Sequence, residues 1–226
     1  MDKIRYYFGW FNGTVPEKIA QSLLGDMTCK KSLAIISGTP TDYETTDKMV
    51  ALAINVWFGP AGIVFDSYHT IDYRMEKERI RDILKNASVI LLHGGNPVSL
   101  NDFLCEYGMS ETIKNSNATV VMGASAGAMN MSAKWVDDWT EEIKIRDGLG
   151  LDSFAIEPHA IFDGATALAN DEHIKNNIMP LSENVDMYVA CEESTIRIKN
   201  GKLESMGDVY LISKSSISQL KDSLCV

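Results

Sequence analysis

A single serine, Ser125, stands among very small residues that follow an apolar segment. From Val120 the sequence reads VVMGASAGAMNMS. Apart from Ser125 itself, every residue from Gly123 to Ala128 is glycine or alanine. A chain that turns sharply from a buried strand into a helix needs small neighbours to avoid a collision across the turn. The pattern G-x-S-x-G therefore predicts a serine hydroxyl exposed above a sheet, placed to act as a nucleophile. The alternative is that these residues only let a helix pack closely on a strand.

A serine hydroxyl is a weak nucleophile until a base takes its proton, and the sequence offers four histidines. His69 and His93 precede the serine, whereas His159 and His173 follow it. His159 lies in FAIEPHAIF, which predicts a short loop restricted by Pro158. His173 lies in the polar helical segment DEHIKNN, where we expect a solvated side chain. His159 is thus the candidate base, and a purely structural histidine is the alternative.

A carboxylate should orient that base, and YVACEESTIRI offers Glu192 and Glu193. In a continuing strand the two side chains point to opposite faces, so only one can face the histidine. Either residue alone could equally be a solvated turn charge. An α/β-hydrolase would place the histidine last, but none follows His173. The order serine, histidine, acid therefore points to a different fold with the same chemistry.

The segment HGGNP, which begins at His93, could supply the oxyanion site. Gly94 and Gly95 precede a helical segment, and their loop amides could act with the amide of Ala126. A βα turn that needs glycine for its backbone angles is the alternative. Because the carboxyl ends of neighbouring parallel strands meet at one edge, this loop and the serine would share a crevice.

Strand-length apolar runs alternate with amphipathic segments, the pattern of a parallel sheet wrapped by helices. The predicted strands are 4–11, 32–39, 63–70, 88–95 and 119–126. The predicted helices between them are 16–26, 42–58, 75–87 and 97–115, and a later one spans 166–181. In residues 185–213, apolar and polar side chains alternate with a period of two on either side of a KNG turn. This pattern predicts antiparallel strands near one edge of the sheet. We expect one α/β domain over 1–226, with a mostly parallel sheet, helices on both faces and a C-terminal antiparallel strand block.

Composition excludes several classes of protein. With 45% hydrophobic and 23% charged residues the chain is globular, and a net charge of −10 argues against a nucleic-acid partner. The most apolar window, residues 49–65, is too short to span a membrane. The N-terminal residues lack the features of an export signal. We therefore expect a cytoplasmic protein. The four scattered cysteines predict reduced thiols and no metal site; they are Cys29, Cys105, Cys191 and Cys225.

Taken together, these segments resemble peptidase family S51, the group of peptidase E (aspartyl dipeptidase) and cyanophycinase. That family's fold is similar to class I glutamine amidotransferases, which are flavodoxin-like, with serine in place of cysteine. The resemblance covers nearly the whole length. It is carried by HGGN from His93, GASAGA from Gly123, the pair Pro158 and His159, and E-x-S-T-I from Glu192.

The resemblance implies that Ser125 is the nucleophile, His159 the general base and Glu192 the orienting acid. Glu192 is preferred over Glu193 because the apolar residues after it match the strand that follows the acid in the family. The oxyanion donors would come from Gly94, Gly95, Asn96 and the amide of Ala126. A cytoplasmic homodimer that needs no cofactor is also implied.

The family also suggests a substrate. Peptidase E cleaves dipeptides with an N-terminal aspartate, and binding that side chain requires a cationic residue in the pocket. The candidates are Arg146, Arg197 and Lys134. Each of them could equally be a surface charge. Pro97 follows Asn96 where family members commonly carry a polar residue, so the pocket edge could differ. We expect a serine exopeptidase that cleaves short peptides through an acyl-enzyme. The alternatives are a catalytically silent ligand-binding or regulatory protein, and an amidase or esterase.

Overall fold

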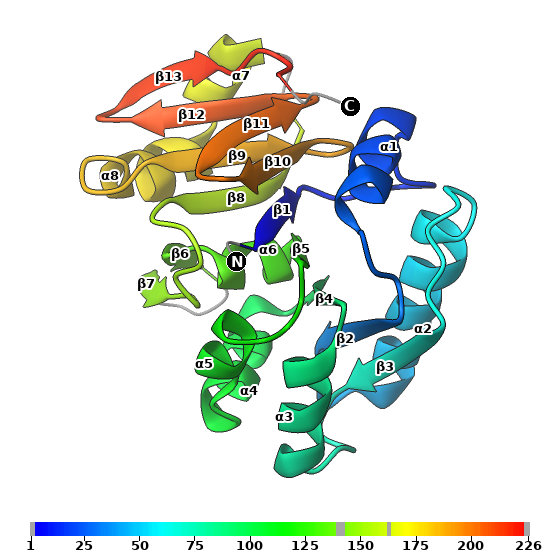
Figure 1. The fold of residues 1–226 in the computed structure, drawn as a ribbon. Coiled ribbons are helices and arrows are strands. Elements are labelled where there is room, and N and C mark those ends of the chain that lie inside the picture. The colour runs from blue at the N-terminus through cyan, green and yellow to red at the C-terminus, as the bar shows by residue number, and fades with distance from the viewer. Residues whose placement is uncertain (1–2, 139–142, 162–163, 224–226) are drawn as a thin grey trace.

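A parallel sheet lies at the centre of the computed structural model, which describes residues 3–138, 143–161 and 164–223 (Figure 1). Its order is β11-β10-β1-β5-β4-β2-β3, and the last five of these strands run parallel. Of the two remaining strands, β10 pairs antiparallel with β1, and β11 pairs antiparallel with β10. The strands are β1 (Ile4–Phe8), β2 (Ser32–Gly38), β3 (Ser67–Ile71), β4 (Val89–Gly95), β5 (Val120–Ala124), β10 (Thr195–Lys199) and β11 (Lys202–Met206).

Helices cover both faces of this sheet, because successive strand residues point to opposite sides. Tyr6 and Phe8 pack with α1 and η1, whereas Tyr7 between them joins the cluster on the other face. One face carries α1 (Glu17–Asp26), α2 (Tyr43–Leu52) and the π-helix η1 (Ala53–Phe58). The other carries α3 (Lys77–Asn86), α4 (Pro97–Glu106), α5 (Met109–Lys114) and α6 (Ala126–Met131).

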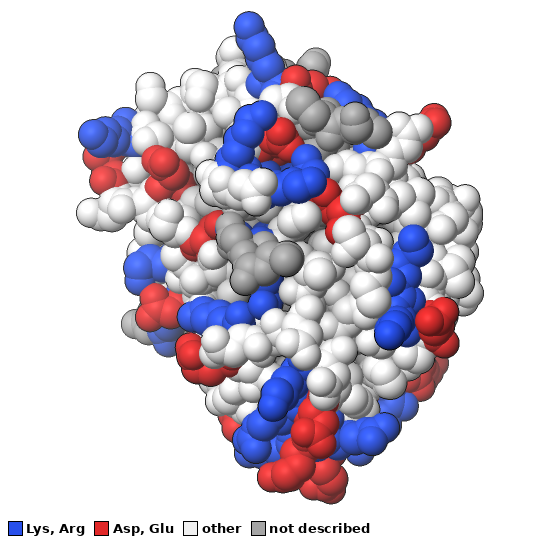
Figure 2. Space-filling view, viewed as in Figure 1, with Lys and Arg blue, Asp and Glu red and all other residues white. Residues whose placement is uncertain are grey.

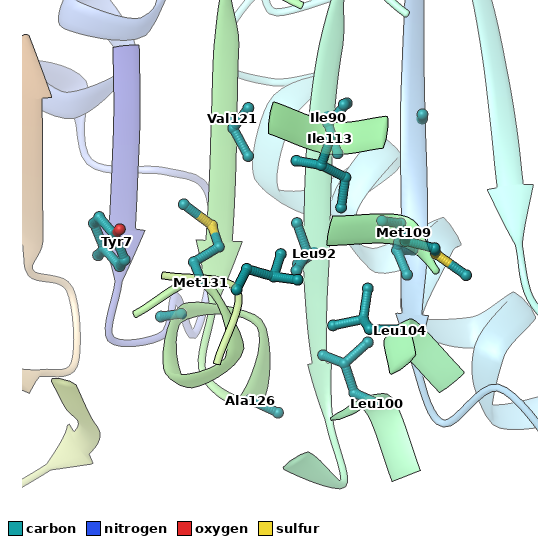
Figure 3. Close-up of a cluster of buried hydrophobic side chains, with 14 of the residues drawn as sticks. Tyr7, Ile90, Leu92, Leu100, Leu104, Met109, Ile113, Val121, Ala126 and Met131 are labelled. Carbon is teal, nitrogen blue, oxygen red and sulfur yellow. The ribbon is translucent and has the colours of Figure 1, made fainter. Parts of the chain in front are cut away.

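Figure 3 shows the core on this second face. Leu100 and Leu104 of α4 and Met109 and Ile113 of α5 lie over Leu92 and its neighbours on β4 and β5, with Met131 of α6 beside them. These side chains are almost completely buried. Burial of such side chains contributes about 1.5–3 kcal/mol each, so this layer holds α6 firmly against the sheet.

A second sheet packs against the first, and its strands β8, β9, β12 and β13 lie in the upper part of Figure 1. Its order is β13-β12-β9-β8-β6-β7. One face contributes Ile156, Ala190 and Val209 to the core of the first sheet, and the other is covered by three short helices. The elements are β6 (Lys134–Asp137), β7 (Lys144–Asp147), β8 (Ala155–Ala160), α7 (Gly164–Asn170), η2 (Ile174–Ile178), α8 (Met179–Leu181), β9 (Met187–Cys191), β12 (Val209–Ser213) and β13 (Ser216–Gln219).

The expected mixed α/β fold with a parallel sheet is confirmed, but the sequence did not predict this second sheet. The KNG turn does join β10 to β11 at the edge of the first sheet. Strands β9 and β12, which lie in the block that we expected near the same edge, belong instead to the second sheet, as does β13, which lies beyond that block. Period-two alternation identifies a strand and its two faces, but it carries no information about which sheet the strand joins.

Other expectations concern the surface and the cysteines. On the face drawn in Figure 2, cationic and acidic side chains are interspersed. None of the helices within the described ranges is long and apolar enough to cross a membrane. Cys29 and Cys105 are free thiols, Cys191 is buried in β9, and Cys225 lies outside the described residues.

Candidate active site

Ser125 forms the turn between β5 and α6. Its backbone angles are φ 52° and ψ −120°, which few residues other than glycine adopt and which cost about 1–3 kcal/mol. Its N–H donates a hydrogen bond to the carbonyl of Phe8 at 3.2 Å, which ties the turn to the end of β1. Ser125 is also the one partly exposed residue between positions 120 and 132. A strained backbone therefore presents a single hydroxyl at the surface.

The small residues around the serine also let α6 approach the sheet closely. A Cβ added to Gly127 would collide with the backbone carbonyl of Leu92 on β4. The fully buried side-chain amide of Asn130 donates to the carbonyls of Pro97 and Ala126, both at 3.0 Å. Close packing and a sharp turn thus occur together, and both help to fix the position of Ser125.

Ser125 lines a cavity of about 390 Å³ together with His159. Gly95, Ala126, Asp138 and Glu157 also contribute to its wall. The serine comes from the first sheet and the histidine from β8 of the second. The cavity therefore lies where the two sheets meet.

His159 stands on a β-bulge rather than in the loop that the sequence predicted. The pairing of β8 with β9 shifts between Pro158 and Ala160, and His159 has φ 62°. A bulge leaves one residue unpaired and redirects its side chain, which here lies in the cavity wall. Burial lowers the pKa of His159 below its usual 6.5, and the carboxylate of Glu192 opposes this shift. The imidazole is therefore neutral at pH 7 and able to accept a proton.

Glu192 and Glu193 follow β9 and diverge. Oε1 of Glu192 lies 3.9 Å from Nδ1 of His159, which is ion-pair range but longer than a hydrogen bond. Oε1 of Glu193 instead accepts a hydrogen bond from the backbone N–H of Asn12 at 2.8 Å. Of the two carboxylates, the structure brings Glu192 to the histidine.

The loop at the end of β4 lies directly against Ser125. A Cβ added to Gly94 would meet the ring of Trp10 at 2.6 Å and Cβ of Ser125 at 3.2 Å, so only glycine fits between them. Gly95 and Ala126 line the cavity. The N–H of Ala126 belongs to the first turn of α6, where no acceptor exists within the helix. This amide is well placed to face a developing negative charge.

Asn96 has a structural role in this loop. Its backbone N–H donates to the carbonyl of Gly38 at 2.9 Å, and its side-chain oxygen accepts from the N–H of Ser99 at 2.9 Å. The second bond caps the N-terminus of α4, as asparagine commonly does. The backbone amide of Asn96 is therefore already engaged.

The three cations considered for binding an acidic substrate are engaged elsewhere. Arg146 contacts Asp137 at 2.6 Å, and Lys134 contacts Asp147 at 2.7 Å. Arg197 is buried on β10, where it pairs with Asp26 at 2.6 Å and with Glu204 at 2.5 Å. Of the described residues that line the cavity of Ser125, none is a lysine or an arginine.

Sequence reasoning missed a cluster of charged groups beside the cavity. His173 lies between two carboxylates, with Nδ1 3.2 Å from Asp138 and Nε2 3.3 Å from Glu157. The expectation of a solvated His173 was wrong, since the side chain is partly buried. The hydrogen bond to Glu157 raises the pKa of His173, and burial raises the pKa of Glu157. No spacing in the sequence links Asp138, Glu157 and His173, which come from three separate segments.

These groups line a second cavity of about 420 Å³ that adjoins the first. Asp138, Glu157 and His159 belong to both cavities, and Asp171 and His173 line the second. Three carboxylates and two imidazoles thus line this second cavity. Even with His173 protonated, this region has an excess of negative charge when the carboxylates are ionised.

His93 is buried behind the site and does not line the cavity of Ser125. Its ring stacks on Trp57 with a centroid distance of 4.9 Å and an interplanar angle of 10°, and it meets Trp10 at 5.8 Å. Neither ring nitrogen has a hydrogen-bond partner among the described residues. Burial lowers the pKa of His93 to about 4, against a weaker opposing influence of the Gly94 backbone.

Comparison with solved structures supports the fold. A peptidase from an acI-B1 Actinobacterium has a similar structure, with a TM-score of 0.70, 15% identity, and coverage of 98% of this chain and 95% of that chain. A candidate peptidase E protein from Listeria monocytogenes EGD-e gives a TM-score of 0.62 and 17% identity, with coverage of 90% of this chain and 98% of that chain. At these identities the likeness shows the fold alone, and no curated protein matches the chain.

The family model for peptidase family S51 matches residues 16–206. That span includes the turn at Ser125, the bulge at His159 and the paired glutamates after β9. Because the match covers most of the sequence, the chain belongs to peptidase family S51.

Proposed function

We propose that this chain is a serine-type peptidase that hydrolyses short peptides with Ser125 as nucleophile, His159 as general base and Glu192 as orienting acid. One observation carries the proposal. Ser125 and His159 come from different sheets and line the same cavity, and Glu192 lies 3.9 Å from the histidine. Family membership supports a peptidase.

The reaction follows the logic of a serine triad. Nδ1 of His159 faces Glu192, which leaves Nε2 to accept the proton of the Ser125 hydroxyl. The serine oxygen bonds to the carbonyl carbon of the substrate, and the resulting oxyanion faces the N–H of Ala126. His159 then gives its proton to the leaving amine as the C–N bond breaks. Water, deprotonated by the same histidine, hydrolyses the acyl-enzyme and restores Ser125.

The cavity favours a small substrate. Its volume of about 390 Å³ lies within the range of pockets that hold small ligands, about 300–1,000 Å³. Residues from β4, α6 and β8 line it on both sides of Ser125. This size supports exopeptidase or dipeptidase action.

The charge of the wall bears on how the substrate binds. Asp138 and Glu157 line the cavity, and none of its described lining residues is a lysine or an arginine. A free ammonium group of the substrate would be stabilised by these carboxylates, whereas a substrate carboxylate would be repelled. A dipeptide with an N-terminal aspartate would therefore place its ammonium group, and not its side chain, on this wall.

A dipeptide panel tests the proposal. Wild-type protein should hydrolyse at least one class of dipeptide, and Ser125→Ala should lower the rate by at least about a thousandfold while the fold is retained. Ser153→Ala, at an exposed serine away from the cavity, is the matched control and should keep full activity. An active Ser125→Ala variant would contradict the proposal. Hydrolysis of esters or simple amides, with no dipeptide cleaved, would favour an amidase or esterase.

A further inference from the structure

The loop between β1 and α1, residues 9–16, touches the base and the acid of the candidate triad and also the oxyanion loop. Two of its residues make these contacts, Trp10 and Asn12. The loop lies about 180 residues from the glutamates in sequence, so the contacts form only when the fold is complete. Neither residue has a role in the chemistry described above.

Asn12 holds both glutamates of the turn after β9. Its side-chain amide donates a hydrogen bond of 2.6 Å to Oε2 of Glu192, and its backbone N–H donates to Oε1 of Glu193 at 2.8 Å. The carbonyl of Trp10 accepts a further bond of 2.8 Å from the N–H of Glu193. Three hydrogen bonds therefore clamp the loop to the turn.

The bond to Glu192 determines where that carboxylate points. With Oε2 fixed by Asn12, Oε1 is the oxygen that faces Nδ1 of His159. The side chain of Glu192 is 30% exposed, so without Asn12 it would be free to exchange rotamers in water. A hydrogen bond to an ionised acceptor is among the stronger kinds and suits this positioning task.

Trp10 supports the histidine from the same loop. Its ring centroid lies 5.2 Å from that of His159 at an interplanar angle of 34°, and the ring also packs against Gly94. The indole thus limits the movement of the imidazole on one side, while Asn12 fixes the carboxylate on the other. The loop thereby restricts the positions of His159 and Glu192 relative to each other.

We propose that Asn12 is a positioning residue of the candidate triad, which aims the carboxylate of Glu192 at His159. This inference rests on the proposed function for its catalytic meaning, but the arrangement itself can be tested without turnover. Asn12 is not among the described residues that line the cavity of Ser125, and its side-chain amide acts through Glu192.

The test compares three loop variants. Asn12→Ala removes the side-chain donor but leaves the backbone N–H for Glu193. It should lower kcat by about tenfold to a hundredfold, the scale expected for a misplaced catalytic group, with little change in KM. Asn12→Gln keeps an amide donor and should recover part of the loss. Thr14→Ala, at an exposed position of the same loop, is the matched control and should behave as wild type.

A second measurement follows the titration of His159 by NMR, assigned by the signal that disappears in His159→Gln. Glu192 raises the pKa of His159, so Asn12→Ala should move the titration to lower pH. In a Glu192→Ala background Asn12→Ala should have no further effect on kcat or on the titration, because the two residues act as a pair.

The outcomes separate this inference from the proposed function. A wild-type titration and wild-type kcat in Asn12→Ala would overturn it. Lower stability and lower kcat with an unmoved titration would also overturn it, since that result describes a structural role. If the wild-type protein cleaves no peptide but the titration still shifts only when Glu192 is present, the positioning role stands and the proposed function fails.

Discussion

Oε1 of Glu192 lies 3.9 Å from Nδ1 of His159, whereas the carboxylate of the adjacent Glu193 turns away to the backbone of Asn12. Two chemically identical side chains next to each other in sequence thus have different surroundings. Only one of them is placed to stabilise an imidazolium. This difference leads to the first prediction.

Glu192→Gln should lower kcat strongly, whereas Glu193→Gln should change it little. An orienting carboxylate that fixes the tautomer and stabilises the imidazolium contributes up to about 10⁴ in kcat in a serine triad. We expect at least about a hundredfold loss in Glu192→Gln and less than about threefold in Glu193→Gln. Steady-state kinetics on the best dipeptide measures both. Equal losses in the two variants would refute the assignment of roles.

The acid limb of the pH profile of kcat/KM should lie below the usual pKa of a histidine. His159 must be neutral to accept the serine proton, so activity falls as pH drops through the pKa of this residue. Burial holds that pKa below 6.5, and the acid limb should therefore lie below pH 6.5. Glu192→Ala removes the opposing charge and should move the limb still lower. An acid limb above pH 7 would disagree with the environment of His159.

Substrate charge should matter at the wall formed by Asp138 and Glu157. Asp138→Asn removes one carboxylate with almost no change in shape. We expect KM for dipeptides with a free N-terminal ammonium group to rise by about tenfold relative to their N-acetylated forms, the scale of one charge-assisted hydrogen bond. The readout is the ratio between the two substrates, so a general loss of activity does not affect it. An unchanged ratio would mean that the substrate cation binds elsewhere.

Acid should destabilise the protein through His93. The buried ring binds a proton only near pH 4, whereas the unfolded chain binds one near 6.5. As pH falls between these values the unfolded state gains more protons, so the free energy of unfolding falls, by about 3 kcal/mol in total.

His93→Phe should abolish this part of the pH dependence, because phenylalanine keeps the stack on Trp57 without a titratable group. Urea unfolding at pH 7 and pH 4.5 measures the effect in both proteins. Identical slopes of stability against pH in wild type and His93→Phe would show that another group is responsible.

Local sequence was sufficient for the parts of the fold that depend on neighbouring residues. The small residues around Ser125 predicted the strand, turn and helix, because steric room across a tight turn is a local requirement. The parallel strands and their helices followed from periodicity in the same way. The segment of His159 was expected to be a loop, and the structure shows a bulged strand instead. The bulge and its positive φ arise from pairing with β9, so they leave no sequence signature.

Long-range arrangements were not accessible from the sequence. The second sheet forms because β8 and β9 bury one face on the first sheet and the other under η2, and neither contact is encoded within the strands themselves. The cluster around His173 joins residues from three separate segments. The contact of Asn12 with Glu192 spans 180 positions, so no spacing rule could have indicated it.

The most direct test of the account is covalent labelling with a fluorophosphonate, followed by mass spectrometry of the modified peptide. The account predicts one adduct, on Ser125, that is absent from Ser125→Ala and forms much more slowly in His159→Gln. An adduct on a different residue, or folded wild-type protein that remains unlabelled after prolonged exposure, would contradict it.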